Sequence, residues 1–191
     1  MSSYETGLLS EIAASLPATV APDSPPTFAY VFRTHARYVV GLVRRLGVSA
    51  CDAEDIAQEV FLAVHAGLPK FEGRAKLKTW LCSICVHKVR DYRRQAFRRR
   101  ETVTAEPIPS SAPDTTLSPS LRAGHVRLLE DIVGRLPDAQ RQVFVLYDVE
   151  GFSMAEVARM VECPIFTAYG RLRTARHEVR TRFDAAMRRF P

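Results

Sequence analysis

The chain has 191 residues, of which 47% are hydrophobic, 9% aromatic and 25% charged, and its formal net charge is +6. A chain of this length can bury one modest core or two small ones, and its positive charge favours a polyanionic partner, although the same charge can serve solubility alone. No apolar run is long enough to span a membrane and the start lacks a basic, then apolar leader, so we expect no membrane insertion and a cytoplasmic location.

The first 26 residues are predicted to be an N-terminal extension. Residues 8–16 have helical spacing, but Pro17, Pro22, Pro25 and Pro26 break any continuation. We therefore treat residues 1–26 as loosely attached to the domain that follows.

Residues 27–100 are predicted to form a bundle of three or four helices. Apolar residues recur at helical intervals and strand-like alternation is absent. The first helix ends at Gly47, and the second begins in "SACDAED" with a serine or aspartate cap and acids in its first turn. The third begins near Leu77 and continues into the basic tract "RRQAFRRRE".

The segment 101–124 is rich in proline, serine and threonine, which predicts a flexible linker. Residues 125–190 again have helical spacing, with breaks at Pro137 and Gly151 and a capping box formed by Ser153 and Glu156. The sequence thus predicts an all-α fold with two small helical domains joined by a flexible linker.

The last two predicted helices are separated by a short turn at Cys163–Pro164, which is helix-turn-helix spacing. At about 100° per residue, one side of the last helix collects Ile165, Ala168, Leu172, Ala175 and Val179. The opposite side carries Phe166, Thr167, Gly170, Arg173, Thr174 and His177. Arginine and hydroxyl groups can bind base edges and phosphates in a major groove, so we favour DNA binding over a solvated amphipathic helix in a bundle.

Cys82 and Cys85 form a C-x-x-C pair in the middle of a predicted helix. His87 lies about 200° around that helix from Cys85, so it cannot complete a metal site with the two thiols. We expect small buried thiols and neither a metal nor a cofactor, with a redox pair as the alternative.

Two longer runs carry a family resemblance. The run "DAEDIAQEVFLAVHAGLPKFEGRAKLKTWLCSICVHKVRDYRRQ" resembles region 2 of bacterial sigma-70-type factors of the extracytoplasmic-function (ECF) group. The run "LPDAQRQVFVLYDVEGFSMAEVARMVECPIFTAYGRLRTARHEVR" resembles their region 4, and nothing resembling region 3 lies between the two.

The resemblance implies a promoter-specificity subunit of RNA polymerase that is not itself an enzyme. Its implied partners are core RNA polymerase, through the beta-prime clamp helices and the beta flap, promoter DNA and an anti-sigma factor. The implied core-polymerase-binding residues are Asp52, Asp55, Gln58 and Glu59. A solvated helix start with dipole-favourable acids is the alternative for this segment.

Region 2 of the family opens and binds the minus-ten element, and the third helix here mixes cations with flat rings, as single-strand capture requires. The implied minus-ten residues are Lys78, Thr79, Trp80, His87, Lys88, Arg90, Arg93 and Arg94. His87 stands where the family usually has an asparagine, in a loop or helix start that holds a flipped base, and an imidazole cannot copy the amide's paired donor and acceptor. A surface histidine without a role and a core tryptophan at position 80 are the alternatives.

Region 4 of the family reads the minus-thirty-five element as duplex. The implied contacts are Thr167, Tyr169, Gly170, Arg171, Arg173 and Thr174. Phe166 replaces the family's usual glycine, so we expect a changed base preference. The ring of Phe166 can contact a thymine methyl or fold back onto Tyr169, and the sequence leaves both open.

Three other functions are compatible with parts of the pattern. A stand-alone helix-turn-helix regulator would bind a two-fold symmetric operator without polymerase. A thiol-based metal or redox sensor would depend on Cys82 and Cys85. A pure protein-interaction bundle would lack salt-dependent affinity for DNA.

Overall fold

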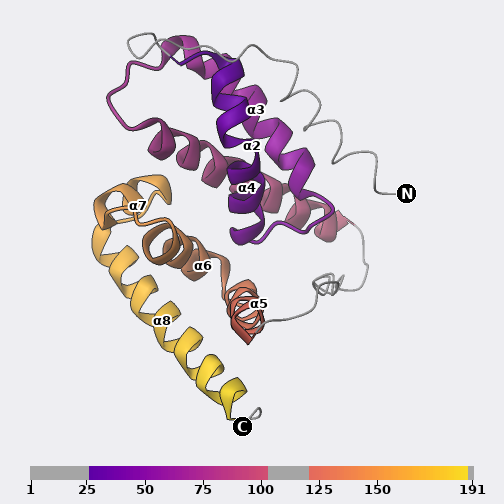
Figure 1. Ribbon diagram of the computed structural model, residues 1–191, viewed down its shortest axis with the longest axis vertical. Coiled ribbons are helices and arrows are strands. Elements are labelled where there is room, and N and C mark those ends of the chain that lie inside the picture. Colours follow the sequence, from indigo (N-terminus) through magenta and orange to yellow (C-terminus); the bar gives the residue numbers. More distant parts are fainter. Residues whose placement is uncertain (1–25, 103–120, 189–191) are drawn as a thin grey trace.

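The fold is seen in a computed structural model that describes residues 26–102 and 121–188 (Figure 1). The described residues form helices and turns without a strand, which confirms the predicted all-α class. The predicted helix at 8–16 and most of the predicted linker lie outside them. No helix within the described ranges is long and apolar enough to cross a membrane.

The first domain consists of α2 (Phe28–Arg45), α3 (Ala53–Gly67), the short 3-10 turn η1 (Leu68–Lys70) and α4 (Leu77–Thr102). Helix α2 begins after Thr27, whose side chain accepts a hydrogen bond from the backbone N–H of Tyr30 at 3.3 Å. The three long helices bury a common apolar core that includes Val39, Leu42, Val60, Val64, Leu81 and Val89.

The end of α2 needs a glycine for two reasons. Gly47 has φ +96°, a left-handed conformation that side chains with a Cβ rarely adopt. The guanidinium of Arg141, from the other half of the chain, lies where a Cβ atom at this position would be. The predicted helix end at Gly47 is therefore confirmed, and it is also a point of close approach.

The predicted start of the second helix is confirmed in position, and Ser49 Oγ accepts a hydrogen bond from the Asp52 backbone N–H at 3.2 Å, but the Asp52 side chain does not cap the helix. Asp52 stands at the N-cap position of α3 without a capping hydrogen bond. Its carboxylate instead accepts hydrogen bonds from Ser49 Oγ at 2.5 Å and from the Tyr92 hydroxyl of α4 at 2.7 Å. The side chain therefore ties α3 to α4 instead of capping the helix.

The second domain consists of α5 (Leu121–Gly134), α6 (Asp138–Phe144), the π-helical segment η2 (Val145–Val149), α7 (Met154–Met160) and α8 (Ile165–Met187). Helix α5 begins inside the predicted linker, and α4 runs two residues into it from the other side. The capping box of α7 is confirmed, since Ser153 Oγ accepts from the backbone N–H of Glu156 while the Glu156 carboxylate accepts from the Ser153 backbone.

The two domains pack directly on each other. Figure 1 shows α7 beside α4, while α8 runs away from the first domain towards the C-terminus. Their buried apolar residues form one continuous cluster that includes Leu46, Val86, Phe152 and Met160. The sequence left the placement of the domains open, and this packing decides which predicted site residues reach solvent.

Candidate nucleic-acid interface

Helices α7 and α8 and the turn between them form the predicted helix-turn-helix. Helix α7 ends at Met160, Pro164 stands at the N-cap position of α8 with ψ 143°, and the turn contains Glu162 at φ +52°. A proline before the first helical residue suits the start of a helix, because its missing N–H has no partner there anyway. The turn leaves the first residues of α8 pointing away from the core.

The buried side of α8 agrees with the prediction at four of its five positions. Ala168, Leu172, Ala175 and Val179 are buried, and they pack on α5, α6 and α7. Ile165 is different because it is 38% exposed. It is the first residue of the helix, where the neighbouring helices do not cover it.

The outward side of α8 brings together most of the predicted minus-thirty-five residues. Thr167, Tyr169, Arg173 and Thr174 are exposed, whereas Gly170 and Arg171 are half-buried. The hydroxyl of Thr174 donates to the Gly170 carbonyl at 3.1 Å, so its proton is used within the helix. Phe166 is 86% exposed, and so it is not folded back onto Tyr169.

Arg176 has a structural role that the sequence pattern does not indicate. Its guanidinium donates to both carboxylate oxygens of Asp148, at 2.9 and 2.5 Å, and lies 5.5 Å from the centre of the Tyr147 ring. The paired hydrogen bonds raise the pKa of Arg176. This side chain joins α8 to η2 through Asp148 while remaining 52% exposed.

The acidic surface of α3 is smaller than predicted. Asp55, Gln58 and Glu59 are exposed on α3, whereas Asp52 is turned towards Ser49 and Tyr92 as described above. The Lys88 ammonium of α4 lies 3.4 Å from a Glu59 carboxylate oxygen.

Leu62 is a residue of this surface that the sequence reasoning missed. It is 71% exposed, and it follows Asp55 and Glu59 at intervals of helical neighbours. A single exposed leucine is common on protein surfaces, but here it adds apolar area to the acidic face predicted to bind the polymerase. The exposure of Leu62 could have been predicted from the sequence, because Leu62 lies on the side of the helix opposite Ile56, Val60 and Val64.

The aromatic residues of the first domain lie partly inside it. Trp80 is half-buried against Phe71, with ring centres 5.0 Å apart, so core packing accounts for much of its surface. The Tyr92 hydroxyl donates to Asp52, and burial together with this hydrogen bond raises the pKa of Tyr92. Tyr92 is therefore held inside the domain.

The predicted minus-ten residues of α4 divide into two groups. Lys88 and Arg94 pair within the first domain, with Glu59 and with Asp91. Trp80 likewise packs on Phe71 of the first domain. The remaining residues contact side chains of the second domain: Lys78, Thr79, His87, Arg90 and Arg93. His87 lies in the middle of α4, so the expected loop or helix start is wrong for this position.

Arg90 makes the most complete of these contacts. Its guanidinium donates to both carboxylate oxygens of Glu162, at 2.5 and 3.1 Å, and one of its nitrogens lies 3.1 Å from His87 Nδ1. The hydrogen bonds from Arg90 lower the pKa of Glu162 and raise that of Arg90. This two-pronged pair joins α4 to the turn of the helix-turn-helix.

Glu150 is the centre of a second group of contacts between the domains. Its side chain is 5% exposed, and its carboxylate accepts hydrogen bonds from the Tyr38 hydroxyl and Arg45, each at 2.7 Å. The Lys78 ammonium lies 3.1 Å from the same carboxylate. Burial alone would raise the pKa of Glu150, but the hydrogen bonds from Tyr38, Lys78 and Arg45 outweigh burial and lower it.

The two cysteines of the C-x-x-C pair are buried thiols, as predicted. Cys82 Sγ lies 2.8 Å from the Tyr38 hydroxyl, and burial raises the pKa of Cys82 to about 11. Burial raises the pKa of Cys85 as well. Protonated, buried thiols are poor nucleophiles and poor metal ligands, and the described part of the chain contains no cluster of three metal-ligating side chains.

Two family models match the chain, one in each domain. The model of sigma-70 region 2 matches residues 31–99, and the model of sigma-70 region 4 matches residues 127–178. Together these matches cover more than half of the chain and include α2–α4 and most of the second domain.

Curated relatives give the same result. The chain is 29% identical to the ECF RNA polymerase sigma-E factor of Escherichia coli, over 79% of this chain and 83% of the relative. It is 34% identical to the ECF RNA polymerase sigma factor SigD of Mycobacterium tuberculosis, over 75% of this chain and 65% of the relative.

Two solved structures share the fold. The sigma factor RpoE of Bartonella quintana, in complex with the anti-sigma factor NepR, has a TM-score of 0.69 at 22% identity and covers 79% of this chain and 92% of its own. CnrH, in complex with the cytosolic domain of CnrY, has a TM-score of 0.57 at 23% identity and covers 93% of this chain and 96% of its own.

Sigma factors are transcription initiation factors that bind core RNA polymerase and promoter DNA. The two family matches and the curated relatives do not favour a stand-alone regulator, although such a regulator would also carry a helix-turn-helix. The chain belongs to the sigma-70 family of RNA polymerase sigma factors, in the extracytoplasmic-function group.

Proposed function

We propose that the three helices α3, α4 and α8 divide the work of promoter-specific initiation between them. Helix α3 docks on core polymerase, α4 captures the opened minus-ten strand and α8 reads the minus-thirty-five duplex. The observation that carries the proposal is the exposed outward face of α8 behind a tight helix-turn-helix. The polymerase supplies catalysis, and this chain acts in the cytoplasm without an enzymatic activity of its own.

The minus-thirty-five assignment rests on the first half of α8. Thr167, Tyr169 and Arg173 are all exposed in the half of the helix that enters a major groove in helix-turn-helix proteins. Arg173 supplies a two-pronged donor for guanine, and Phe166 and Tyr169 supply apolar and aromatic surface for thymine methyl groups. Gly170 has no side chain to obstruct the DNA backbone, and nothing else in the described chain lies where its Cβ would be.

The minus-ten assignment rests on the cations of α4. Lys78 and Arg90 lie on one surface with Thr79, and Trp80 adds the edge of an indole ring beside them. Cations that follow the phosphates and flat rings that stack on bases are the usual means of holding a single strand. His87 adds a ring that can stack, with fewer hydrogen bonds than an amide offers.

The core-polymerase assignment rests on α3. Asp55, Gln58 and Glu59 surround the exposed Leu62, which gives an apolar centre with an acidic rim. Such a patch suits a basic coiled coil, and the beta-prime clamp helices are the partner that the family implies. From the same family resemblance, we propose that the second domain binds the beta flap of the polymerase.

We also propose that an anti-sigma factor controls this chain. Both solved sigma factors with the same fold were seen with a partner protein, NepR in one case and the cytosolic domain of CnrY in the other. Such a partner would hold the chain away from core polymerase until it is released.

The first test is transcription in vitro with sigma-free core polymerase and a pool of upstream fragments from the source genome. Defined transcripts are expected with the wild-type chain and not without it. Asp55→Arg should abolish them by placing a cation where the clamp requires an acid, and Arg173→Ala should abolish them by removing the base contact.

Two matched variants accompany this test. Glu130→Arg makes the same kind of charge reversal at an exposed position of α5, and Arg180→Ala removes an exposed arginine further along α8. Both should retain transcription. If the polymerase gains no specificity while the chain alone shifts a two-fold symmetric duplex, the protein is a conventional regulator and the assignment of the first domain is wrong.

A further inference from the structure

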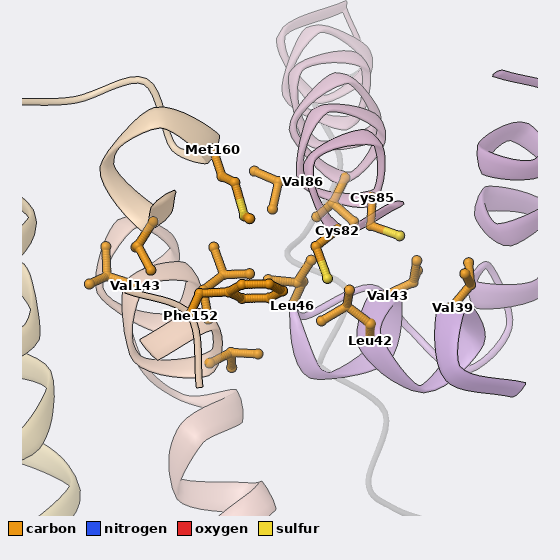
Figure 2. Packing of buried hydrophobic residues seen from close by; sticks show 14 of the residues in the cluster. Val39, Leu42, Val43, Leu46, Cys82, Cys85, Val86, Val143, Phe152 and Met160 are labelled. Atoms are coloured by element: carbon orange, nitrogen blue, oxygen red, sulfur yellow. The ribbon is translucent and has the colours of Figure 1, made fainter. Parts of the chain in front are cut away.

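The contact between the two domains has an apolar centre. Figure 2 shows Phe152 of the second domain directed at Leu46 of α2, and Met160 of α7 directed at Val86 of α4. Phe152 and Met160 are 8% and 3% exposed, so the contact removes them from water almost completely. Separation of the domains would expose the faces of these two side chains that contact Leu46 and Val86.

Acidic side chains of the second domain surround this centre. Glu150 accepts hydrogen bonds from Tyr38 and Arg45 and pairs with Lys78, as described above. A carboxylate oxygen of Glu156 lies 3.4 Å from the Thr79 hydroxyl. At the other end of the contact, Glu162 binds Arg90. Each carboxylate therefore meets a donor of the first domain.

Glu162 has an unusual backbone for this task. Its φ of +52° is left-handed, a conformation that costs energy for a residue with a Cβ and that glycine adopts freely. Glycine would satisfy the turn equally well. Strain of this kind persists where the surrounding structure gains something from the side chain, and the described contacts of this side chain are with Arg90 and His87 of the other domain.

The donors that meet these carboxylates are also the residues proposed to bind the minus-ten strand. We propose that the second domain competes with that strand for α4. In a closed form of the free chain, the carboxylates of the second domain bind the donors of α4, Glu150 with Lys78, Glu156 with Thr79 and Glu162 with Arg90. The domains must separate before single-stranded DNA can bind α4. This inference rests on the proposed function of α4.

The chemistry of the contact supports competition. A carboxylate and a backbone phosphate each carry one negative charge and two oxygens that an arginine can bind together. Arg90 and Lys78 therefore cannot serve Glu162 or Glu150 and a phosphate together. The outward face of α8 takes no part in the contact, since Phe166, Tyr169 and Arg173 remain exposed. The closed form thus engages the Lys78, Thr79 and Arg90 part of the single-strand surface, where the Lys78 and Arg90 side chains remain 47% and 42% exposed, and leaves the outward face of α8 open.

The test uses Glu162→Gly in the full chain, because glycine removes the carboxylate and relieves the turn without endangering the fold. Closure is measured as a distance between spin labels on Cys51, which is exposed in the first domain, and on Thr181→Cys in α8, in a Cys163→Ser background. Cys82 and Cys85 are buried and stay unlabelled. Single-strand binding is measured by fluorescence anisotropy of a labelled oligothymidylate.

We expect Glu162→Gly to lengthen the distance between the labels and to raise the affinity for the oligothymidylate by about fivefold, the effect of one partly exposed ion pair. Glu130→Gln, which removes an exposed carboxylate from α5, should change neither quantity. Glu162→Arg should also open the chain, and adding Arg90→Glu to it should restore the short distance.

Two results would overturn the inference. An unchanged distance in Glu162→Gly would show that the ion pair does not hold the domains together. A longer distance without tighter binding would show that closure masks no single-strand surface. The transcription assay described above decides separately whether the chain is a working sigma factor, so failure of the closed form and failure of the proposed function can be told apart.

Discussion

Phe166 is the residue whose role the structure narrows most. The sequence left two possibilities for its ring, and an exposure of 86% removes the one in which it folds onto Tyr169. A ring that projects from the start of α8 is available to a thymine methyl group in the major groove. It contributes little to the fold, because it buries almost no surface.

We therefore expect Phe166→Ala to change promoter recognition and to leave stability within about 0.5 kcal/mol of wild type. The measurement is duplex binding with the promoter found by transcription, in which each thymine of the minus-thirty-five element is replaced in turn by uracil. Loss of the contacted methyl should weaken wild-type binding about fourfold, the effect of one apolar carbon removed from water.

The same replacement should have no further effect on Phe166→Ala, since the ring that the methyl contacts is already missing. Met187→Ala, a change at an exposed apolar residue near the other end of α8, should respond to uracil as the wild type does. A uracil effect of equal size in Phe166→Ala and wild type would contradict the assignment.

Individual residues also show which side-chain positions can be predicted from the sequence and which cannot. The spacing on α8 predicts the buried positions Ala168 to Val179 correctly, because 3.6-residue periodicity depends on the helix alone. The same spacing fails at Ile165, since exposure at a helix end depends on neighbouring helices. On α3, the sequence did not reveal that the Asp52 carboxylate binds Tyr92, because the partner of a carboxylate also depends on a neighbouring helix.

At the scale of elements, Arg141 fixes the end of α5. This arginine is 8% exposed, and its guanidinium donates to the carbonyls of Val133, Gly134 and Leu136 at 3.1, 2.7 and 2.6 Å. The last carbonyls of a helix have no partner within it, so a fork of N–H donors satisfies several of them at once. Helix α5 is thereby joined to α6.

Arg141→Met should lower the free energy of unfolding by about 3 kcal/mol, because buried carbonyls lose their donors. Arg141→Lys should fall between methionine and wild type, since one ammonium cannot reach all three carbonyls. Urea denaturation followed by circular dichroism measures both. Arg135→Met, at an exposed position near the same helix end, serves as the comparison and should stay within about 0.5 kcal/mol. Equal losses at positions 135 and 141 would rule out the capping role.

The existence and order of the helices could be predicted from apolar spacing and from breaks at Gly47, Pro137 and Gly151, which are local signals. The start of α5 could not be predicted from these signals. Gly124 reads as a break by intrinsic propensity, but α5 continues through it and packs on α8, where the rings of His125 and Phe183 are 6.2 Å apart. The π-helical segment after Phe144 likewise leaves no local sign in the sequence.

At the scale of the whole molecule, the buried carboxylate of Glu150 makes the contact between the domains sensitive to acid. Its pKa in the folded chain is lowered from 4.5, because Tyr38, Lys78 and Arg45 outweigh the effect of burial. A lowered folded pKa means that the stabilising contribution is fully present above pH 4.5 and is lost as pH falls through the folded value. The contact should therefore weaken in acid and not in base.

Glu150→Gln tests this dependence. The variant should be less stable than wild type by about 2 kcal/mol at neutral pH, since its neutral amide leaves two cations partly unpaired. Its stability should then fall less steeply than that of wild type between neutral pH and pH 3, as measured by urea denaturation at a series of pH values.

Glu178→Gln provides the comparison, because Glu178 pairs with Arg182 in α8 at a half-exposed site and its loss should cost less than about 1 kcal/mol. Parallel pH profiles for wild type and Glu150→Gln would exclude Glu150 as the origin of the acid sensitivity. The sequence could not have identified this carboxylate, since its partners Tyr38 and Lys78 lie far from it along the chain and only the packing of the domains brings them together.

The exposed face of α8 and the contacts of α4 with the second domain affect how much the free protein binds RNA non-specifically. Surfaces that hold single strands through phosphates and stacking discriminate poorly between DNA and RNA, and RNA is abundant wherever transcription occurs. A chain in which α4 was always accessible would be bound by RNA transcripts and kept from the polymerase. If Glu150, Glu156 and Glu162 engage α4 as we propose, the free protein keeps the outward face of α8 exposed while these carboxylates compete with RNA for the cations of α4.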